Sequence, residues 1–213
     1  MVKKAAAPLA GLDGLFVAGT SGRLLMRSPD RLLLFDQQAR KTITELQVAQ
    51  VKSVVWNSDY SLVALLSKRQ LIICNKNLDQ LCVVNETVRL KGGCWDQSVT
   101  KPLFVYTTLN HVKYVLPNGY RGILRCLDTP VYAAKLQGQT LFCLDREGKM
   151  KTIEIDVTEA LFKLALEKKD YGEVHIPSIS LYTLYTLTYP LYPYKPSIPI
   201  YTPSPPSPPY SLA

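Results

Sequence analysis

Up to Asp156, apolar residues come in short runs that alternate with polar residues and end at turn-forming residues. Runs of this kind, rich in β-branched and aromatic side chains, predict β-strands. No convincing helical period precedes Asp156. The clearest expected strands are Arg31–Asp36, Leu62–Leu66, Leu71–Cys74, Phe104–Thr108 and Lys113–Leu116.

These strands recur with a regular spacing. Phe35, Cys74 and Val115 hold equivalent places in LLLFDQQ, LIICNKN and VKYVLPN, and they are 39 and 41 residues apart. Glu154, in MKTIEID, follows Val115 after another 39 residues. The chain therefore contains a repeat of about 40 residues, the length of one β-propeller blade.

A second set of positions gives the same period. Trp56 in VKSVVWN and Trp95 in LKGGCWD are 39 residues apart, and VYAAKLQ at 131–137 falls about 40 residues further on. A unit of this length with four short strands is typical of a propeller, in which neighbouring blades bury each other's apolar faces. An irregular antiparallel sandwich is the alternative. The predicted structural anchors of the blades are Phe35, Trp56, Cys74, Trp95 and Val115.

The number of repeats sets the predicted domains. Residues 12–157 hold about three and a half units, whereas propellers close with about four to eight blades. We predict a mainly β chain, with a partial WD40-like propeller of about three to four blades over residues 1–157. Its bare blade faces would be covered by further blades of a larger propeller or by another chain.

A helix is expected directly after the last strand. Asp156 and Glu159 have the spacing of a capping box, and Leu161, Leu164 and Ala165 recur at helical spacing. These signals predict a helix from about Thr158 to Lys169, within a segment 158–174. So short a helix needs a partner for its apolar face, either the last blade or further helices.

Charge and composition narrow the possible functions. The net charge is +8, which raises the possibility of a nucleic-acid-binding propeller. The basic residues are scattered, however, so we expect no nucleic-acid partner. The five cysteines form no CxxC pair and are expected to be reduced thiols of a cytosolic protein. The N-terminal segment is not expected to be a signal peptide, and no apolar run has the length of a membrane helix.

The sequence shows no catalytic constellation. Gly19–Gly22 lacks the lysine of a phosphate loop, and His111 and His175 have no spaced ligand partners. We therefore predict that the chain is not an enzyme. We expect no cofactor, no metal and no small-molecule substrate.

The chain is similar to the coatomer alpha subunit family over roughly Val2–Val174. Tyr106–Tyr114 (YTTLNHVKY) and Phe142–Arg146 (FCLDR) carry the resemblance most specifically. The other matching segments are Lys52–Trp56, Val63–Leu66, Ile72–Asn75, Gly122–Arg125, Phe162–Leu166 and Tyr171. The resemblance implies that the chain covers the later blades of a second β-propeller and the first helix of an α-solenoid.

The same resemblance implies a function. It suggests a non-enzymatic scaffold subunit of the COPI vesicle coat, which carries proteins from the Golgi to the endoplasmic reticulum and within the Golgi. The expected partners are other coatomer subunits, above all beta-prime. The expected location is cytoplasmic and peripheral on Golgi and COPI vesicle membranes. No cargo-binding residue can be carried over onto this chain.

The segment 175–213 departs from this pattern. It holds ten of the fifteen prolines and a single charged residue, Lys195. Pro190, Pro193, Pro196 and Pro199 fall on every third residue, as in a polyproline II ligand of SH3 or WW domains. A proline-rich interaction module is thus the alternative function. We favour a disordered, low-complexity Pro/Tyr-rich tail, hypothetically a read-through or mis-spliced end.

Overall fold

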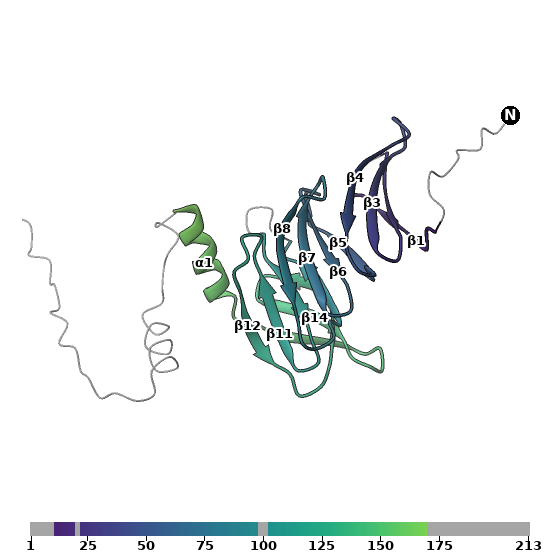
Figure 1. Cartoon of the computed structure of the whole chain (residues 1–213). Coiled ribbons are helices and arrows are strands. Elements are labelled where there is room, and N and C mark those ends of the chain that lie inside the picture. Colours follow the sequence, from purple (N-terminus) through teal and green to yellow (C-terminus); the bar gives the residue numbers. More distant parts are fainter. Residues whose placement is uncertain (1–10, 20–21, 98–101, 170–213) are drawn as a thin grey trace, which may run out of the picture. The chain divides into compact units, whose positions relative to one another are not determined.

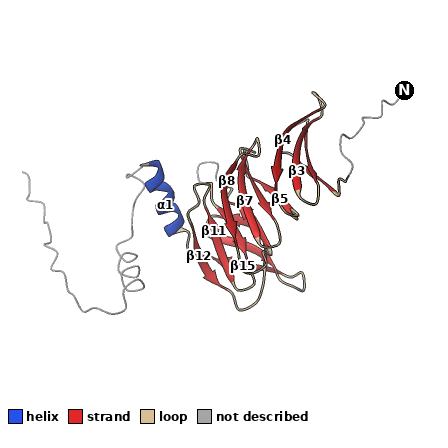
Figure 2. Ribbon diagram, viewed as in Figure 1, coloured by secondary structure: helices blue, strands red, loops and turns tan. Residues whose placement is uncertain are grey.

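The computed structural model describes residues 11–19, 22–97 and 102–169. The chain divides into two units, Met1–Val174 and His175–Ala213, and every described residue belongs to the first unit. Within these residues the chain forms fifteen strands and one helix (Figure 1). Figure 2 shows the same mainly β structure, with a single helix following the strands.

The strands form four antiparallel sheets, each built from consecutive strands in chain order. We call these sheets the first to fourth blades. The first blade contains β1 (Gly14–Val17), β2 (Arg23–Arg27), β3 (Arg31–Asp36) and β4 (Lys41–Gln47). The second contains β5 (Ser53–Trp56), β6 (Leu62–Leu66), β7 (Gln70–Asn75) and β8 (Gln80–Asn85). The third contains β9 (Gly92–Trp95), β10 (Phe104–Thr107), β11 (His111–Val115) and β12 (Arg121–Cys126). The fourth has three described strands: β13 (Tyr132–Gln137), β14 (Thr140–Leu144) and β15 (Met150–Glu154).

This architecture confirms the predicted fold class, a partial β-propeller followed by one helix. The tight turns explain part of the repeat. Asp36 ends β3, and its carboxylate accepts hydrogen bonds from the backbone N–H groups of Gln38 and Ala39. Asn75 ends β7 and binds the N–H groups of Asn77 and Asp79 in the same way. Asx turns of this kind fix the hairpin between the third and fourth strands of a blade.

The apolar core consists of three clusters, one at each junction between neighbouring blades. The strand β6 shows how one strand serves two of them. Val63 and Leu65 face the first blade, whereas Ala64 and Leu66 face the third. A sheet covered on both faces needs a continuous apolar run instead of a polar alternation. The sequence LVALL at 62–66 meets this requirement.

The helix α1 (Thr158–Lys168) completes the third of these clusters. Ala160 and Leu164 are buried with Val112 and Tyr114 of the third blade and with Leu141 of the fourth. Within the described residues, the third and fourth blades therefore cover the buried side of α1. Within the described residues no helix is long and apolar enough to cross a membrane.

The predicted capping box at the start of α1 is wrong. The N-cap position belongs to Val157, which makes no side-chain capping hydrogen bond. The Asp156 carboxylate instead accepts a hydrogen bond from the backbone N–H of Thr158, at 2.9 Å. Val157 is 7% exposed within the cluster that α1 completes. Its burial fixes the entry of the chain into the helix, so Asp156 lies one position too early to act as the cap.

Candidate functional site

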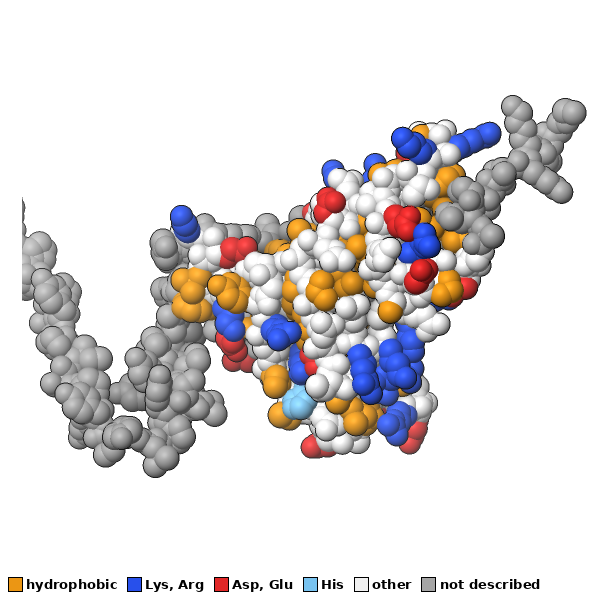
Figure 3. Space-filling view, in the orientation of Figure 1, with side chains coloured by type: hydrophobic (Ala, Val, Ile, Leu, Met, Phe, Trp, Pro, Cys, Tyr) orange, Lys and Arg blue, Asp and Glu red, His pale blue; other side chains and the backbone are white. Residues whose placement is uncertain are grey.

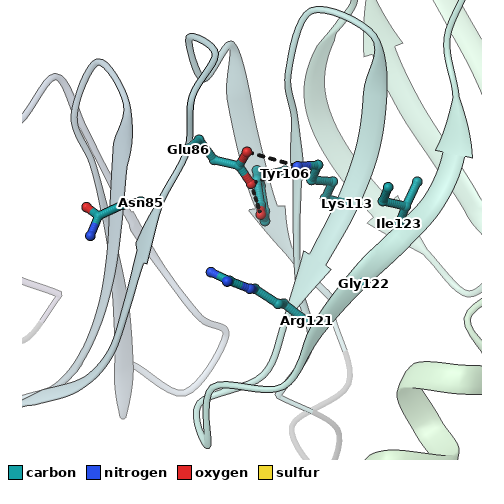
Figure 4. A pocket seen from close by; sticks show the side chains of 7 residues that line it. All are labelled: Asn85, Glu86, Tyr106, Lys113, Arg121, Gly122 and Ile123. Carbon is teal, nitrogen blue, oxygen red and sulfur yellow. Dashed lines mark hydrogen bonds and ion pairs between the residues drawn. The ribbon is translucent and has the colours of Figure 1, made fainter.

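A polar depression on the described surface lies between the outer strands of the second and third blades. It has a volume of about 280 Å³ and we call it the outer crevice. Figure 4 shows its lining side chains, which come from the end of β8 on one side and from β10, β11 and β12 on the other. Its lining residues are Asn85, Glu86, Tyr106, Lys113, Arg121, Gly122 and Ile123.

Strand register brings the third-blade residues of the crevice together. Tyr106 of β10 pairs with Lys113 of β11, and Lys113 pairs with Ile123 of β12. These side chains share one face of the sheet, the face that also carries Val115 into the core shared with the second blade. Arg121 pairs with Val115 and therefore also faces the second blade.

An ion pair between the two blades forms the inner wall of the crevice. The Lys113 ammonium lies 2.9 Å from both carboxylate oxygens of Glu86, and the Tyr106 hydroxyl donates to the same carboxylate at 2.8 Å. The Glu86 side chain is only 10% exposed and that of Lys113 is 21% exposed. Since Glu86 follows β8 and its two donors belong to the third blade, this cluster links the blades through polar contacts beside their apolar core.

The surroundings set the protonation of this cluster. Burial alone would raise the pKa of Glu86, but the hydrogen bonds from Lys113 and Tyr106 and the positive charges nearby outweigh it and lower the pKa. Burial and the hydrogen bond to Glu86 raise the pKa of Tyr106 well above its usual range. Glu86 is thus held as a carboxylate and Tyr106 as a neutral donor, which suits a fixed structural contact.

Arg121 forms the outer part of the crevice. Figure 4 shows its side chain reaching from β12 toward the strand that carries Asn85. No described residue makes a hydrogen bond or ion pair with its guanidinium, although its charge helps to lower the pKa of Glu86. Ile123, two residues along β12, is 54% exposed. The outer crevice therefore presents an available guanidinium and an exposed apolar side chain at its opening.

A second depression, of about 330 Å³, lies by the first strands of the second, third and fourth blades. It is lined by both predicted tryptophan anchors, Trp56 of β5 and Trp95 of β9. The Trp56 indole N–H donates to the carbonyl oxygen of Val17 at 2.9 Å, and that of Trp95 donates to the carbonyl oxygen of Val55 at 2.8 Å. Each tryptophan therefore bonds the first strand of the preceding blade.

The other predicted anchors lie apart from both depressions. Phe35, Cys74 and Val115 are in the third strands of the first three blades, β3, β7 and β11. Cys74 and Val115 are fully buried, and burial together with the charge of Asp79 raises the pKa of the Cys74 thiol to about 12. The prolines of the alternative binding motif, Pro190, Pro193, Pro196 and Pro199, lie outside the described residues.

Sequence reasoning did not identify the outer crevice. Tyr106 pairs with Lys113 because a short hairpin joins β10 to β11. The alternation of apolar and polar residues in the sequence is enough to predict such a hairpin. It does not predict the approach of Glu86, because that depends on how the second blade packs on the third. Figure 3 shows lysine and arginine side chains in several separate groups on the viewed face, among acidic and uncharged ones. Among the described residues no cluster of His, Cys, Asp and Glu has the arrangement of a metal site.

Comparison with known proteins adds to this geometry. The family model described as COPA/B second beta-propeller matches residues 3–145. The coatomer subunit alpha-1 of Arabidopsis thaliana is 51% identical over 174 residues, and the coatomer subunit alpha of Dictyostelium discoideum is 38% identical over 163. These matches cover 82% and 76% of this chain but 14% and 13% of the relatives, so the chain spans about one seventh of their length.

Among solved structures, the Cps50 (Swd1) beta-propeller domain of Myceliophteria thermophila superimposes with a TM-score of 0.54 at 13% identity. The match covers 68% of this chain and 52% of that one. At this identity the likeness supports the propeller fold and carries no statement about function.

Proposed function

Because the chain belongs to the coatomer alpha subunit family, we propose that it acts as a protein–protein scaffold in the COPI vesicle coat. In this role it contributes to vesicle-mediated protein transport from the Golgi to the endoplasmic reticulum and within the Golgi. Its location is then cytoplasmic and peripheral on Golgi and COPI vesicle membranes, through the coat. The domains remain as proposed: propeller blades over 1–157, a first solenoid helix over 158–174 and a tail over 175–213.

The observation that carries this proposal is the junction between blades. Each junction combines a separate apolar cluster with polar contacts between main chain or side chains, such as Trp95 to Val55 and Lys113 to Glu86. Packing of this kind holds neighbouring blades in a fixed relation and leaves their outer strands accessible. A fixed surface with accessible outer strands suits the docking of other subunits better than it suits chemistry on a small molecule.

The proposed partner is the beta-prime subunit of coatomer, and co-purification tests it. A tagged form of the whole 213-residue chain is mixed with purified beta-prime and recovered on the tag. We expect beta-prime to be retained, and retention to fall when Leu65→Asp disrupts the core between the first and second blades. A chain that shows the circular dichroism of a folded β protein and yet retains no beta-prime contradicts the proposal.

A further inference from the structure

We infer that the outer crevice receives an acidic side chain from an extended segment of a protein partner, with its carboxylate on the guanidinium of Arg121. This inference deepens the proposed scaffold function and rests on it, because it names the chemistry of one partner contact. The first observation is the guanidinium itself, which has no hydrogen-bond partner among the described residues and points into the gap between two blades (Figure 4).

Charge favours a carboxylate as the occupant. The crevice holds Lys113, Arg121 and Glu86, and the Glu86 charge is already paired with Lys113 at 2.9 Å. Arg121 is therefore the one lining cation without such a pair. An arginine fork binds a carboxylate through two parallel hydrogen bonds. A doubly charged phosphate would meet the fixed Glu86 carboxylate nearby, whereas a singly charged carboxylate balances the single available cation.

Size favours a side chain of a macromolecule over a free metabolite. The crevice has a volume of about 280 Å³, at or below the lower end of the range typical of small-molecule sites. That space accommodates one or two side chains.

Neighbouring groups favour a polypeptide. Ile123 is 54% exposed beside Arg121 and offers an apolar contact to the residue next to the carboxylate. The strands β8 and β12 are both edge strands of their sheets, so their outer backbone groups are available to an extended chain.

The elements that line the crevice are preorganised for this contact. On the opposite face of the third blade, the Tyr114 ring packs directly over Gly122, where a Cβ would come within 2.6 Å of it, and this packing helps to fix β12. The Glu86, Lys113 and Tyr106 contacts hold the facing wall. The arginine therefore extends from a fixed strand toward a fixed wall, which limits the conformational cost of binding.

Binding of a short dye-labelled peptide to the whole chain tests the inference. The peptide carries a glutamate flanked by valines, and a matched peptide carries glutamine in place of the glutamate. We expect the glutamate peptide to bind the chain and to shift the guanidinium Nε–H signal of Arg121 in an isotope-labelled sample. Arg121→Gln should weaken binding by roughly tenfold, the cost of one charge-assisted contact. Arg146→Gln, an exposed position in the turn between β14 and β15, makes the same change of charge and should leave binding unaltered.

Three results overturn the inference: equal affinity for the two peptides, equal affinity of Arg121→Gln and the unaltered chain, or tighter binding of a phosphorylated peptide than of the glutamate peptide. The retention of beta-prime by the unaltered chain is measured separately. Loss of peptide binding with beta-prime retained contradicts only the assignment of the crevice. Loss of beta-prime with the peptide bound contradicts only the proposed partner.

Discussion

Trp95 of the third blade donates its indole N–H to the backbone carbonyl of Val55 in the second blade, at a distance of 2.8 Å. Its ring also meets Phe104 edge to face, with the centroids 5.0 Å apart. One side chain thus joins two blades through a polar bond and packs within the apolar core that they share. Trp56 repeats the bond one blade earlier, to Val17.

Trp95→Phe is expected to destabilise the chain by about 1–3 kcal/mol, because it leaves the Val55 carbonyl without its donor in a partly buried setting. Urea denaturation followed by circular dichroism measures the loss. The matched control is Trp56→Phe, whose acceptor belongs to Val17, a residue that is 77% exposed. Water can hydrogen-bond to the Val17 carbonyl in place of the indole, so Trp56→Phe should lower the free energy of unfolding by no more than about 1 kcal/mol. Equal losses for the two variants would contradict this account.

Glu86→Gln should lower stability at neutral pH, and its effect should fade in acid. The pKa of Glu86 is lower in the folded chain than its ordinary value of 4.5, so its carboxylate stabilises the fold above that pH. This contribution is lost as the pH falls through the lower, folded value. Urea midpoints measured from neutral to acidic pH should converge for the two forms. Glu45→Gln, which breaks an exposed pair with Arg31, is the control and should have little effect.

Gly122→Ala is expected to cost about 1–3 kcal/mol through overpacking. The added methyl group would lie 2.6 Å from the Tyr114 ring, and Tyr114 is fully buried. Thermal unfolding measures the change. Gly148→Ala is the comparison, since its new methyl group would meet nothing within 4 Å and its φ of +78° leaves backbone strain alone. A smaller loss at Gly122 than at Gly148 would show that the Tyr114 ring can move aside.

Leu164→Ala should detach α1 from the blades. Leu164 is 5% exposed in the cluster shared by the third and fourth blades, and truncating such a leucine costs about 2–5 kcal/mol. Hydrogen exchange resolved at the α1 amides should accelerate far more than exchange in β6 and β7. Leu166→Ala, at a position 45% exposed on the same helix, should change neither. Unchanged exchange in Leu164→Ala would mean that other contacts hold the helix.

The five thiols should differ sharply in reactivity. Cys126 is exposed, whereas Cys74, Cys94 and Cys143 are buried. Burial, with help from neighbouring charges at the first two, raises the pKa of Cys74 and Cys94 to about 12 and of Cys143 to about 11. The thiolate is the reactive form, so a maleimide at neutral pH should label Cys126 first. Mass spectrometry of the labelled peptides shows the order, and early labelling of Cys74 would contradict the described burial.

The sequence predicts the elements of this fold well because its signals are local and repeated. The spacing of Phe35, Cys74 and Val115 follows from a hairpin that recurs in each blade, and LVALL at 62–66 reflects a strand buried on both faces. The predicted start of α1 at Thr158 agrees with the structure. The predicted cap at Asp156 does not, because the burial of Val157, a tertiary contact, overrides the local capping signal.

The outer crevice lies beyond what the sequence pattern can show. Tyr106 and Lys113 become neighbours through a hairpin, which an alternating pattern can predict. Glu86 reaches them only because the second blade packs against the third, and the same packing puts Arg121, paired with Val115 across the β11–β12 hairpin, beside the second blade. Contacts between repeats depend on the angle at which sheets stack, and a single sequence carries no direct record of that angle.

The three separate core clusters have a consequence for how the chain unfolds. Each blade shares its apolar residues only with its immediate neighbours, so stability is a sum of terms for single blades and terms for adjacent pairs. The second and third blades take part in two clusters each, and the first takes part in one. Unfolding is then most cooperative in the middle of the array and least cooperative at the first blade. The outward face of the first blade adds to stability only when something packs against it. In such a linear array the first blade is the part that unfolds most easily. When another blade or chain packs on its free face, it becomes an interior blade that is as well protected as the second and third.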